Sequence, residues 1–586
     1  MAVLIPSDIV NSQKTPDGEA LVGRALQSSF PDDTWVWYNP PASSHRPRFV
    51  MLAPDYGVVG IDVCDWSLSS IREVSRSGVR LSDGRLSNPA SELGSRLEAL
   101  RARLAGLRPE PPLQGLVTLP KFSDGEARAR GLDQAFPPDL LVTRDRLCRE
   151  GFDHSLTACP SRITDEVFNG VRDRLYPDTS FQRPRLVSDD GRTERIELRI
   201  RLDAQQEQLA RTLNSSATIV RGVAGSGKSL VLAARARCLA ELHPDWRIQT
   251  LCFNRALVPY LETLVGENRP NVNIATFHKW MYRDMGIRLP WGRNDEELAR
   301  EEQQICTIMD KGLYRGNCDA ILVDEGQDFR PIWYRFLSHA LRPNRGGLLV
   351  VVDGAQSIYR EPDLLDVLDK SATVVCLGRN YRNTVQIGRC ALGTVFGVGI
   401  DGRFVDSRQP PSGRFLSVGA LVQLVWAENW DEQAQFIVAE IARLVSQTSF
   451  EYRDIAVLFP KRAGTVRRIT ENLAGRCIPF YLQQQAWLAK SPLDLRENSV
   501  KVLTIHAAKG LEFPVVFVFG AETVKIPADM HTATEKEANM ARVLYVGMSR
   551  ATDLLYLTYT KSNRIIERAQ SLKACCEFRR YPDDFE

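Results

Sequence analysis

The apolar residues after position 200 gather in short continuous runs that alternate with longer amphipathic segments. Continuous apolar runs of this kind suit strands that are buried on both faces of a parallel sheet. The runs are more numerous than one such sheet needs, so the pattern predicts an α/β fold with two parallel sheets. They comprise Ala217–Val220, Ile321–Val323, Leu348–Val352, Val374–Leu377, Ile455–Phe459, Val500–Leu503, Val515–Phe519 and Leu554–Leu557.

The first hundred residues show a different pattern. Arg48–Ala53 and Val58–Val63 are short apolar runs joined by a turn-forming stretch, which predicts a hairpin. A helix follows, because leucines recur at steps of three and four through Leu93, Leu97, Leu100, Leu104 and Leu107. The proline-rich residues 108–112 cannot continue that helix and are typical of a linker.

These patterns divide the chain into four parts. Residues 1–107 form an N-terminal α/β domain, and residues 108–197 form a linker and helical region whose mixed pattern predicts no particular element. Residues 198–372 form a first core with a small insertion, and residues 373–586 form a second core with a reduced insertion. A chain of 586 residues is too long for one hydrophobic core, which agrees with this division.

Composition narrows the possible classes of protein. The formal charge of +3 is close to neutral, so any affinity for nucleic acid must come from local arrangements of charge. The twelve cysteines include no C-x-x-C pair, which favours reduced thiols over a metal site. We expect a cytoplasmic protein without a membrane partner, because we find neither a signal peptide nor an apolar stretch of the ~20 residues that span a bilayer.

Residues 222–229 match the pattern G-x-x-x-x-G-K-[ST] between a predicted strand and a predicted helix. Such a loop turns backbone N–H groups toward phosphate oxygens. Lys228 is placed to contact the β- and γ-phosphates of ATP, and Ser229 offers a hydroxyl to Mg²⁺. The other predicted loop residues are Gly222, Val223, Ala224, Gly225, Ser226 and Gly227.

A pair of carboxylates ends the strand Ile321–Val323. Asp324 is predicted to hold Mg²⁺ through water, and Glu325 to orient or deprotonate the attacking water. An Asp-Glu pair is more often a solvated acidic loop, but its place after a buried strand, downstream of a phosphate loop, favours the metal site.

Taken in order, further segments resemble the motif series of UvrD/Rep-type superfamily 1 helicases, which have two RecA-like cores. The resemblance runs from about residue 200 to residue 560. Each segment alone could arise by chance, whereas eight in the same order are specific. The segments are 202–206, 251–254, 276–280, 324–328, 353–359, 377–382, 502–512 and 542–550, beside the phosphate loop.

The resemblance implies roles for residues at matching positions. Gln206 would read adenine, Tyr381 would stack on it, and Glu512 would hold the ribose. Gln356 would sense the γ-phosphate, while Arg382 and Arg550 would act as arginine fingers. A guanidinium can meet the charge that spreads over the γ-oxygens, although a single arginine is more often a surface ion pair.

The same resemblance implies a groove for single-stranded DNA or for a duplex with a single-stranded tail. Flat side chains would stack on bases, and short polar side chains would contact phosphates. For Phe277 and Trp280, burial in the core is an equally good interpretation. The predicted nucleic-acid contacts are Asn254, Thr276, Phe277, His278, Tyr359, Thr504 and His506.

Two features depart from this family. Tyr359 is followed by Arg360 and Glu361, where the family has an aromatic that stacks on a base, and Glu361 would repel phosphate. The insertions are also small, so translocation is a safer prediction than processive unwinding. The leading hypothesis is therefore an ATP-dependent DNA translocase or helicase that acts on single-stranded DNA, with 3′ to 5′ movement implied by the resemblance. The alternative is a nucleic-acid-gated ATPase switch in a DNA-repair or anti-phage assembly.

Residues 15–105 resemble the nuclease-related NERD domain through the segments 18–22, 48–54 and 57–66. An active member would need a carboxylate where Arg48 stands and a Glu-x-Lys where residues 62–64 stand. Glu19 and Asp62 alone make a poor site for the metal ions of two-metal hydrolysis. We expect a domain that does not cut nucleic acid and instead binds it or a partner protein; a structural adaptor and an active nuclease fused to a helicase are the alternatives.

Overall fold

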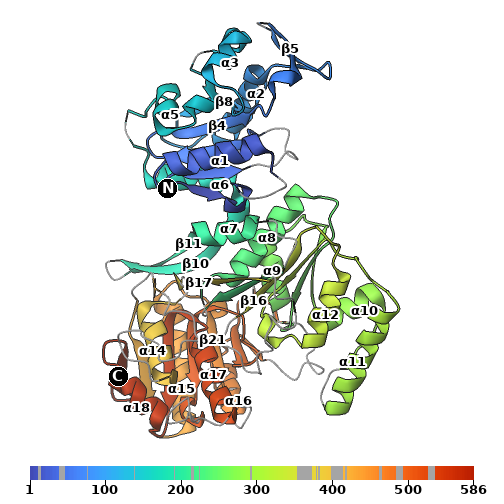
Figure 1. Ribbon diagram of the computed structural model, residues 1–586. Coiled ribbons are helices and arrows are strands. Elements are labelled where there is room, and N and C mark those ends of the chain that lie inside the picture. The colour runs from blue at the N-terminus through green and yellow to red at the C-terminus, as the bar shows by residue number, and fades with distance from the viewer. Residues whose placement is uncertain are drawn as a thin grey trace. The chain divides into compact units, whose positions relative to one another are not determined.

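The structure of the protein is a computed structural model. It describes residues 1–585 except 11–14, 39–45, 76, 138, 161, 190–191, 213–216, 223–224, 256, 291–293, 353–367, 369–371, 378, 381–382, 397–413, 416–418, 461–464, 483–492, 496 and 525–534. The chain forms two compact units (Figure 1). Unit 1 contains Met1–Ser180 and Arg201–Thr212, and unit 2 contains Phe181–Ile200 and Leu213–Glu586.

Unit 1 is built on a six-stranded sheet. The predicted hairpin is present as the antiparallel pair of β3 and β4, and the strand order is β1-β2-β3-β4-β8-β9. The strands are β1 (Val3–Ile5), β2 (Trp35–Tyr38), β3 (Phe49–Ala53), β4 (Gly57–Val63), β8 (Leu113–Leu119) and β9 (Leu141–Thr143). A smaller antiparallel sheet contains β5 (Ile71–Ser75), β6 (Gly78–Leu81) and β7 (Leu86–Ser87).

The predicted leucine helix is α2 (Pro89–Leu104), which packs on β4 and β8. Close packing depends on Gly60 and Gly115, which are partners in neighbouring strands. A Cβ atom at either glycine would lie within 2.8 Å of a Leu97 methyl group. The remaining described α-helices of unit 1 are α1 (Asp17–Ser29), α3 (Asp124–Ala129), α4 (Leu132–Ala135), α5 (Arg149–Ser155), α6 (Asp165–Leu175) and α7 (Ala204–Arg211).

The sequence pattern predicts that the first domain ends at residue 107, but in the structure this domain continues beyond that residue. Beyond the proline-rich stretch, β8 pairs in parallel with β4, and β9 pairs in parallel with β8. Residues 108–112 are therefore the connection from α2 back into the same sheet. The error has a physical cause, because prolines that end a helix look alike in a linker and in a crossover connection.

Unit 2 begins with the long strands β10 (Ser180–Asp189) and β11 (Arg192–Arg201), which pair only with each other among the described strands. Its first core is a parallel sheet of order β14-β13-β15-β16-β12-β17. The strands are β12 (Thr218–Gly222), β13 (Ile248–Cys252), β14 (Val272–Thr276), β15 (Ala320–Val323), β16 (Gly347–Val352) and β17 (Thr373–Leu377). The helices are α8 (Lys228–Leu242), α9 (Leu257–Val265), α10 (Phe277–Met285), α11 (Asp295–Asp310) and α12 (Pro331–Ala340).

The boundary between the cores lies after β17 and not before it. The sequence pattern predicts that the second core starts at residue 373, but Thr373–Leu377 pairs in parallel with β12 and completes the first sheet. An apolar run predicts a strand without indicating which sheet the strand joins, so only the structure could place this one.

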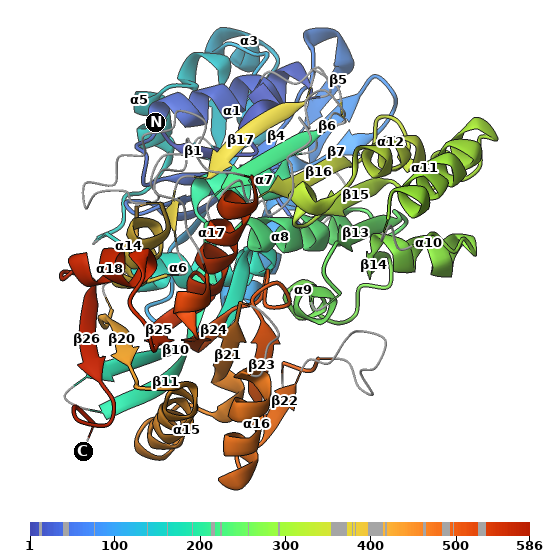
Figure 2. The same cartoon turned by 90° about the horizontal axis from the view of Figure 1, so that it is seen from below.

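The second core is also a parallel sheet, of order β22-β23-β21-β24-β25-β20-β26 (Figure 2). Here α15 packs against α16, and α14 packs against α17 and α18. The strands are β20 (Val422–Trp426), β21 (Ile455–Phe459), β22 (Phe480–Leu482), β23 (Val500–Thr504), β24 (Phe513–Phe519), β25 (Ala551–Tyr559) and β26 (Cys576–Arg580). The helices are α14 (Val385–Phe396), α15 (Trp430–Gln447), α16 (Thr465–Gly475), α17 (Glu535–Met548) and α18 (Arg564–Ser571), and the short strands β18 (Arg379–Asn380) and β19 (Arg414–Phe415) pair apart from them.

All eight apolar runs that the sequence analysis singles out are strands, and the predicted α/β fold with two parallel sheets is confirmed. Most of these strands are buried, as β16 and β21 are, because helices cover both faces of such a sheet. The exception is β17, at the edge of its sheet, in which Val374 and Cys376 are exposed. Within the described part of the chain, none of the helices is both long enough and apolar enough to cross a membrane.

Candidate active site

The phosphate loop begins where β12 ends, at the carboxyl edge of the first sheet. Gly225 and Gly227 have φ angles of 80° and 81°, a left-handed conformation that favours glycine. Gly222 is required for another reason, since a Cβ atom there would lie 2.2 Å from the Ser226 hydroxyl oxygen. The backbone thus turns tightly into α8, whose N-terminus favours negative charge. Val223 and Ala224 lie outside the described residues.

Lys228 and Ser229 form the first turn of α8. The Lys228 side chain is 9% exposed and donates from Nζ to the Gly222 carbonyl oxygen at 2.9 Å. The ammonium group therefore lies folded over the loop whose N–H groups would hold phosphate oxygens. Ser229 Oγ donates to Asp324 Oδ2 at 2.8 Å, which joins the loop to the carboxylate pair.

The carboxylate pair follows β15, and both residues are buried. Asp324 Oδ1 accepts a hydrogen bond from the Glu325 backbone N–H at 2.9 Å. Glu325 has a φ of 52° and a ψ of 44°, a left-handed conformation that is uncommon for a residue with a side chain. Strain of this kind gathers at functional sites. Ser229 and Asp324 present a hydroxyl and a carboxylate side by side, which are hard oxygen donors that suit Mg²⁺.

The two carboxylates have opposite pKa shifts. Burial and the neighbouring Glu325 charge raise the pKa of Asp324 to about 6. Burial also acts to raise the pKa of Glu325, but Lys509, Lys228 and Arg550 outweigh it and hold that pKa below its usual value. Glu325 is therefore the more readily ionised member of the pair, as an orienting or accepting group for water requires.

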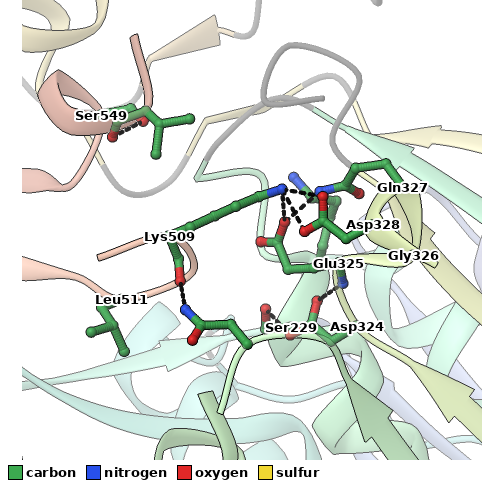
Figure 3. A network of polar contacts seen from close by, with 12 residues as sticks. Ser229, Asp324, Glu325, Gly326, Gln327, Asp328, Lys509, Leu511 and Ser549 are labelled. Carbon is green, nitrogen blue, oxygen red and sulfur yellow. Dashed lines mark hydrogen bonds and ion pairs between the residues drawn. The ribbon is translucent and has the colours of Figure 1, made fainter. Parts of the chain in front are cut away.

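A lysine from the second core completes this network (Figure 3). Lys509 Nζ lies 2.9 and 2.7 Å from the two carboxylate oxygens of Asp328, and 3.5 Å from Glu325 Oε2. The side chains of Lys509 and Asp328 are 6% and 4% exposed. Gln327 Nε2 donates to the same Glu325 oxygen. Neither Lys509 nor Asp328 is among the site residues predicted from sequence, and their separation of 181 positions leaves no local signal.

Breaking this ion pair is expected to show strong coupling between the two residues. Lys509→Met and Asp328→Asn should each lower the stability of unit 2, because each leaves a buried group without its partner. The double variant should regain roughly 0.5–3 kcal/mol of the summed loss. Thermal unfolding of the four proteins measures this coupling. Arg443→Met, which removes a cation paired with Glu440 within α15, is the matched control. Strictly additive losses would show that the pair does not connect the cores.

Arg550 lies in the second core and is fully buried. Its guanidinium donates to the carbonyl oxygens of Val546 and Leu511 and to Ser549 Oγ, at 2.9 to 3.1 Å. It is nevertheless one of the cations that lower the Glu325 pKa. In this conformation the guanidinium of the predicted arginine finger bonds acceptors of its own core. The finger role stays a prediction.

Several other predicted nucleotide contacts remain untested by the structure. Glu512 is half-buried after the Lys509 loop. Gln206 belongs to unit 1, where its Oε1 accepts from the Asp203 backbone N–H at 3.0 Å in a capping box at the start of α7. Four predicted site residues, together with the departure at Glu361, lie outside the described residues: Gln356, Tyr359, Tyr381 and Arg382.

The predicted nucleic-acid contacts divide into buried and accessible groups. Phe277 is 1% exposed and stacks on Trp333 with ring centroids 4.5 Å apart, so burial in the core describes it better than base stacking. Trp280 is fully buried as well. His278 Nε2 lies 3.7 Å from the buried Glu301 carboxylate, and burial lowers the His278 pKa. These side chains connect α10 with α11 and α12, and a contact of Phe277 or His278 with nucleic acid stays a prediction.

Asn254 also has a role that the sequence does not predict. Its Nδ2 donates to the carbonyl oxygens of Ala507 and Lys509 at 3.2 and 2.9 Å. The amide therefore connects the first core to the Lys509 loop of the second core and does not present an open phosphate contact. Thr276 Oγ1 accepts the Lys279 N–H at the start of α10, and Thr504 Oγ1 accepts the Ala507 N–H.

The accessible candidates for nucleic acid lie at the edges of these loops. His506 and Lys279 are exposed. Phe253, next to Asn254, is 45% exposed with its ring 6.2 Å from Trp333. An exposed aromatic beside a buried aromatic cluster is a rigid surface for stacking, which the sequence analysis did not single out. The sequence feature that could have indicated Phe253 is its position directly after β13, at the carboxyl edge of the sheet.

Unit 1 contains the two candidate metal ligands of the nuclease-like domain, Glu19 and Asp62, and arginines pair with both of them. Arg48 Nε lies 2.9 Å from Glu19 Oε1, and Tyr38 OH donates to Glu19 Oε2 at 2.6 Å. The Arg48 backbone N–H and the Arg96 guanidinium both donate to Asp62. Burial raises the pKa of Asp62, although Arg96 acts against this. Each carboxylate thus has a cationic partner, and a metal ion would have to displace it.

Comparison with known protein families gives one match in each of the two cores. Residues 205–362 match the AAA domain family, and residues 482–562 match the UvrD-like helicase C-terminal domain family. The ATP-dependent DNA helicase PcrA of Staphylococcus aureus strain Mu50 is 40% identical over 78 residues, which are 13% of this chain and 11% of that protein. PcrA of Staphylococcus epidermidis strain RP62A is 35% identical over 91 residues, 15% of this chain and 12% of that protein.

The chain therefore spans about a tenth of the length of these curated relatives. The matched segments coincide with the parts that build the site, since the first contains the phosphate loop and the carboxylate pair, and the second contains Lys509 and Arg550. The protein is an α/β protein with two parallel-sheet, RecA-like P-loop cores, similar in its second core to UvrD-like helicases.

Proposed function

We propose that the protein is an ATP-driven motor that moves along single-stranded DNA. The observation that carries the proposal is the network in which Lys509 of the second core ion-pairs with Glu325 and Asp328 of the first core, beside the phosphate loop. Two lobes that share a charged site at their junction can couple the occupancy of that site to their relative position. The likeness to PcrA over the segment that it covers supports DNA as the polymer.

ATP and Mg²⁺ fit the residues present. Lys228 and the backbone N–H groups at the start of α8 would hold the phosphates, while Ser229 and Asp324 would hold Mg²⁺, directly and through water. The metal ion supplies neutralisation of charge on the phosphate oxygens. Glu325 is kept ionised by three cations and would orient the attacking water or accept its proton.

Lys509 gives this site a means of coupling the two cores. With Asp328 and Glu325 as its partners, Lys509 neutralises the same carboxylate that hydrolysis needs. A triphosphate would compete for the Lys509 ammonium, so nucleotide binding would exchange one interlobe ion pair for another. We infer that this exchange, together with contacts of Arg550 and Arg382 with the γ-phosphate, opens and closes the junction between the two cores in each cycle.

The DNA path that we propose runs over the exposed residues at the edge of the first core. Phe253 would stack on a base, while Lys279, Thr276 and His506 would contact the backbone. Movement 3′ to 5′ is proposed from the resemblance to UvrD/Rep-type proteins. Unit 1 is proposed to bind DNA or a partner protein without cutting, because Arg48 and Arg96 neutralise its two candidate metal ligands.

The pH dependence of Mg²⁺ use follows from the raised pKa of Asp324. As the pH falls through about 6, Asp324 takes up a proton and loses its attraction for the cation. The Mg²⁺ concentration needed for half-maximal ATP turnover should therefore rise at acidic pH and stay constant above neutrality. Because metal ion and proton compete for one carboxylate, additional Mg²⁺ should move the acidic midpoint to lower pH. A midpoint independent of Mg²⁺ would assign the titration to another group, and circular dichroism at each pH checks that the fold persists.

ATP turnover with and without a single-stranded oligonucleotide tests the motor directly. We expect strong stimulation by DNA, together with displacement of streptavidin from one end of a biotinylated strand and no shortening of that strand. Stimulated turnover without displacement would support the gated switch in place of the motor. Lack of any stimulation would overturn both, and Mg²⁺-dependent degradation lost in Glu19→Ala would show that unit 1 is a nuclease.

A further inference from the structure

The loop that carries Lys509 follows β23 in the second core and is closed by its own backbone. In this loop, residues 504–511, the N–H groups of Ala507 and Ala508 donate to the Thr504 carbonyl oxygen at 3.0 and 3.1 Å. Gly510 has a φ of 83°, a left-handed conformation that favours glycine. These turns make the loop one compact piece, so a contact anywhere along it also affects where the Lys509 side chain lies.

Two residues of the first core hold this loop within unit 2. Asn254 Nδ2 donates to the carbonyl oxygens of Ala507 and Lys509 at 3.2 and 2.9 Å. Three positions after Asn254, the fully buried Leu257 packs where Gly510 lacks a side chain, since a Cβ atom on Gly510 would lie 2.4 Å from Leu257 Cδ2. The first core therefore fixes the loop backbone at Lys509 itself and at the residue that follows it.

In the position that these contacts set, the Lys509 side chain occupies the carboxylate proposed to act on water (Figure 3). Lys509 Nζ lies 3.5 Å from Glu325 Oε2, and Gln327 Nε2 donates to the same oxygen. A carboxylate oxygen with two such partners is poorly placed to accept the proton of a water molecule. As long as the loop is held, Lys509 restrains Glu325.

Asn254 also adjoins the proposed contact with the DNA strand. It directly follows Phe253, whose ring is 45% exposed. The Asn254 carbonyl oxygen accepts the Leu257 N–H at 3.0 Å, so the chain bends into α9 immediately after the exposed ring. A base that stacks on Phe253 would therefore act on the backbone one peptide bond away from the amide that holds the Lys509 loop.

We propose that Asn254 is a positioning residue for Lys509, which it holds on Glu325 until a DNA strand binds at Phe253. The proposal rests on the proposed function, because it takes from it the strand contact at Phe253 and the role of Glu325. A strand on Phe253 would draw Asn254 away from its two carbonyl acceptors, and the Lys509 loop could then leave the carboxylate. DNA would thus stimulate hydrolysis by releasing a restraint that the first core places on the second.

Asn254→Leu tests the proposal, since it roughly keeps the size of the side chain and removes both donors. ATP turnover without DNA should rise roughly fivefold or more, within the usual range of coupling between two sites, and the stimulation by DNA should fall accordingly. Steady-state phosphate release with and without a single-stranded oligonucleotide measures both. A merely structural role would lower turnover, so the rise distinguishes positioning from folding.

Gly510→Ala approaches the same contact from the second core. The added methyl group meets Leu257 and is disfavoured by the backbone, so the loop should loosen and turnover without DNA should again rise, even if Asn254→Leu folds poorly. Asn271→Leu is the matched control, because it removes an amide that donates to the His243 carbonyl oxygen at 3.1 Å within the first core. It should leave turnover and stimulation unchanged.

The possible results separate this proposal from the proposed function. If DNA stimulates the wild type but turnover without DNA does not rise in Asn254→Leu or in Gly510→Ala, positioning is overturned and the motor stands. If Asn254→Leu binds a labelled oligonucleotide more weakly without that rise, Asn254 is a strand contact, as the sequence predicts, and positioning is again overturned. If DNA does not stimulate the wild type, the proposed function fails and this proposal fails with it.

Discussion

Replacing Lys228 with alanine is expected to reduce ATP turnover by roughly 10²- to 10³-fold, the usual cost of removing one preorganised charge from a transition state. In this structure the Lys228 ammonium lies over the phosphate loop and donates to the Gly222 carbonyl oxygen. Without it, that oxygen and the loop N–H groups remain, but the charge that meets the β- and γ-phosphates is lost. Steady-state phosphate release in saturating DNA measures the effect.

Arg237→Ala is a suitable control for Lys228→Ala, because it removes a cation from the same helix where it bonds the Val265 carbonyl oxygen, away from the loop. Lys228→Arg should not restore full turnover, since a guanidinium is larger and planar and the buried position leaves little room for it. Turnover by Lys228→Ala within twofold of the wild type would mean that the hydrolysed nucleotide does not occupy this loop.

Glu325→Gln is expected to lower the rate of hydrolysis by about 10²- to 10⁴-fold while ATP still binds, because the amide cannot accept the proton of the attacking water. The isosteric change should preserve the hydrogen bond from Gln327 and the left-handed backbone. Single-turnover hydrolysis measures the chemical step, and binding of a fluorescent ATP analogue measures affinity separately.

An equal loss in binding and in hydrolysis would assign Glu325 to nucleotide affinity instead of to chemistry. Glu301→Gln is the matched control, since Glu301 is another buried carboxylate of the first core that bonds Trp333 Nε1 at 2.7 Å. It supports the packing of α11 on α12 and takes no part in the proposed site, so the hydrolysis rate should persist in whatever fraction remains folded.

The structure shows which features the sequence could predict. The phosphate loop and the carboxylate pair are local in the chain, and each is defined by residue types whose spacing is fixed by backbone geometry. The sequence therefore predicts that Ser229 and Asp324 act at one site, and in the structure the two side chains lie 2.8 Å apart. The apolar strands could also be predicted from the sequence, because a strand that is buried on both faces is apolar at every position and does not alternate with polar residues.

Features that depend on distant partners could not be predicted. The pairing of Lys509 with Asp328 depends on how two cores meet, and no local spacing encodes it. Phe277 has the residue type of a base-stacking group, but whether a ring faces solvent or Trp333 depends on how α10 and α12 pack. The predicted domain boundaries at residues 107 and 372 differ from the structure for a related reason. Which strands pair is decided by tertiary contacts, and the composition of the segments does not encode it.

The left-handed backbone at Glu325 has an implication for how this protein can change. A glycine at that position would relieve roughly 1–3 kcal/mol of conformational strain. The chain instead places a carboxylate there and tolerates a less stable fold at the point where water must be activated. Variants selected only for heat resistance should accordingly acquire glycine at residue 325. Such variants would be more stable than the wild type and would not hydrolyse ATP.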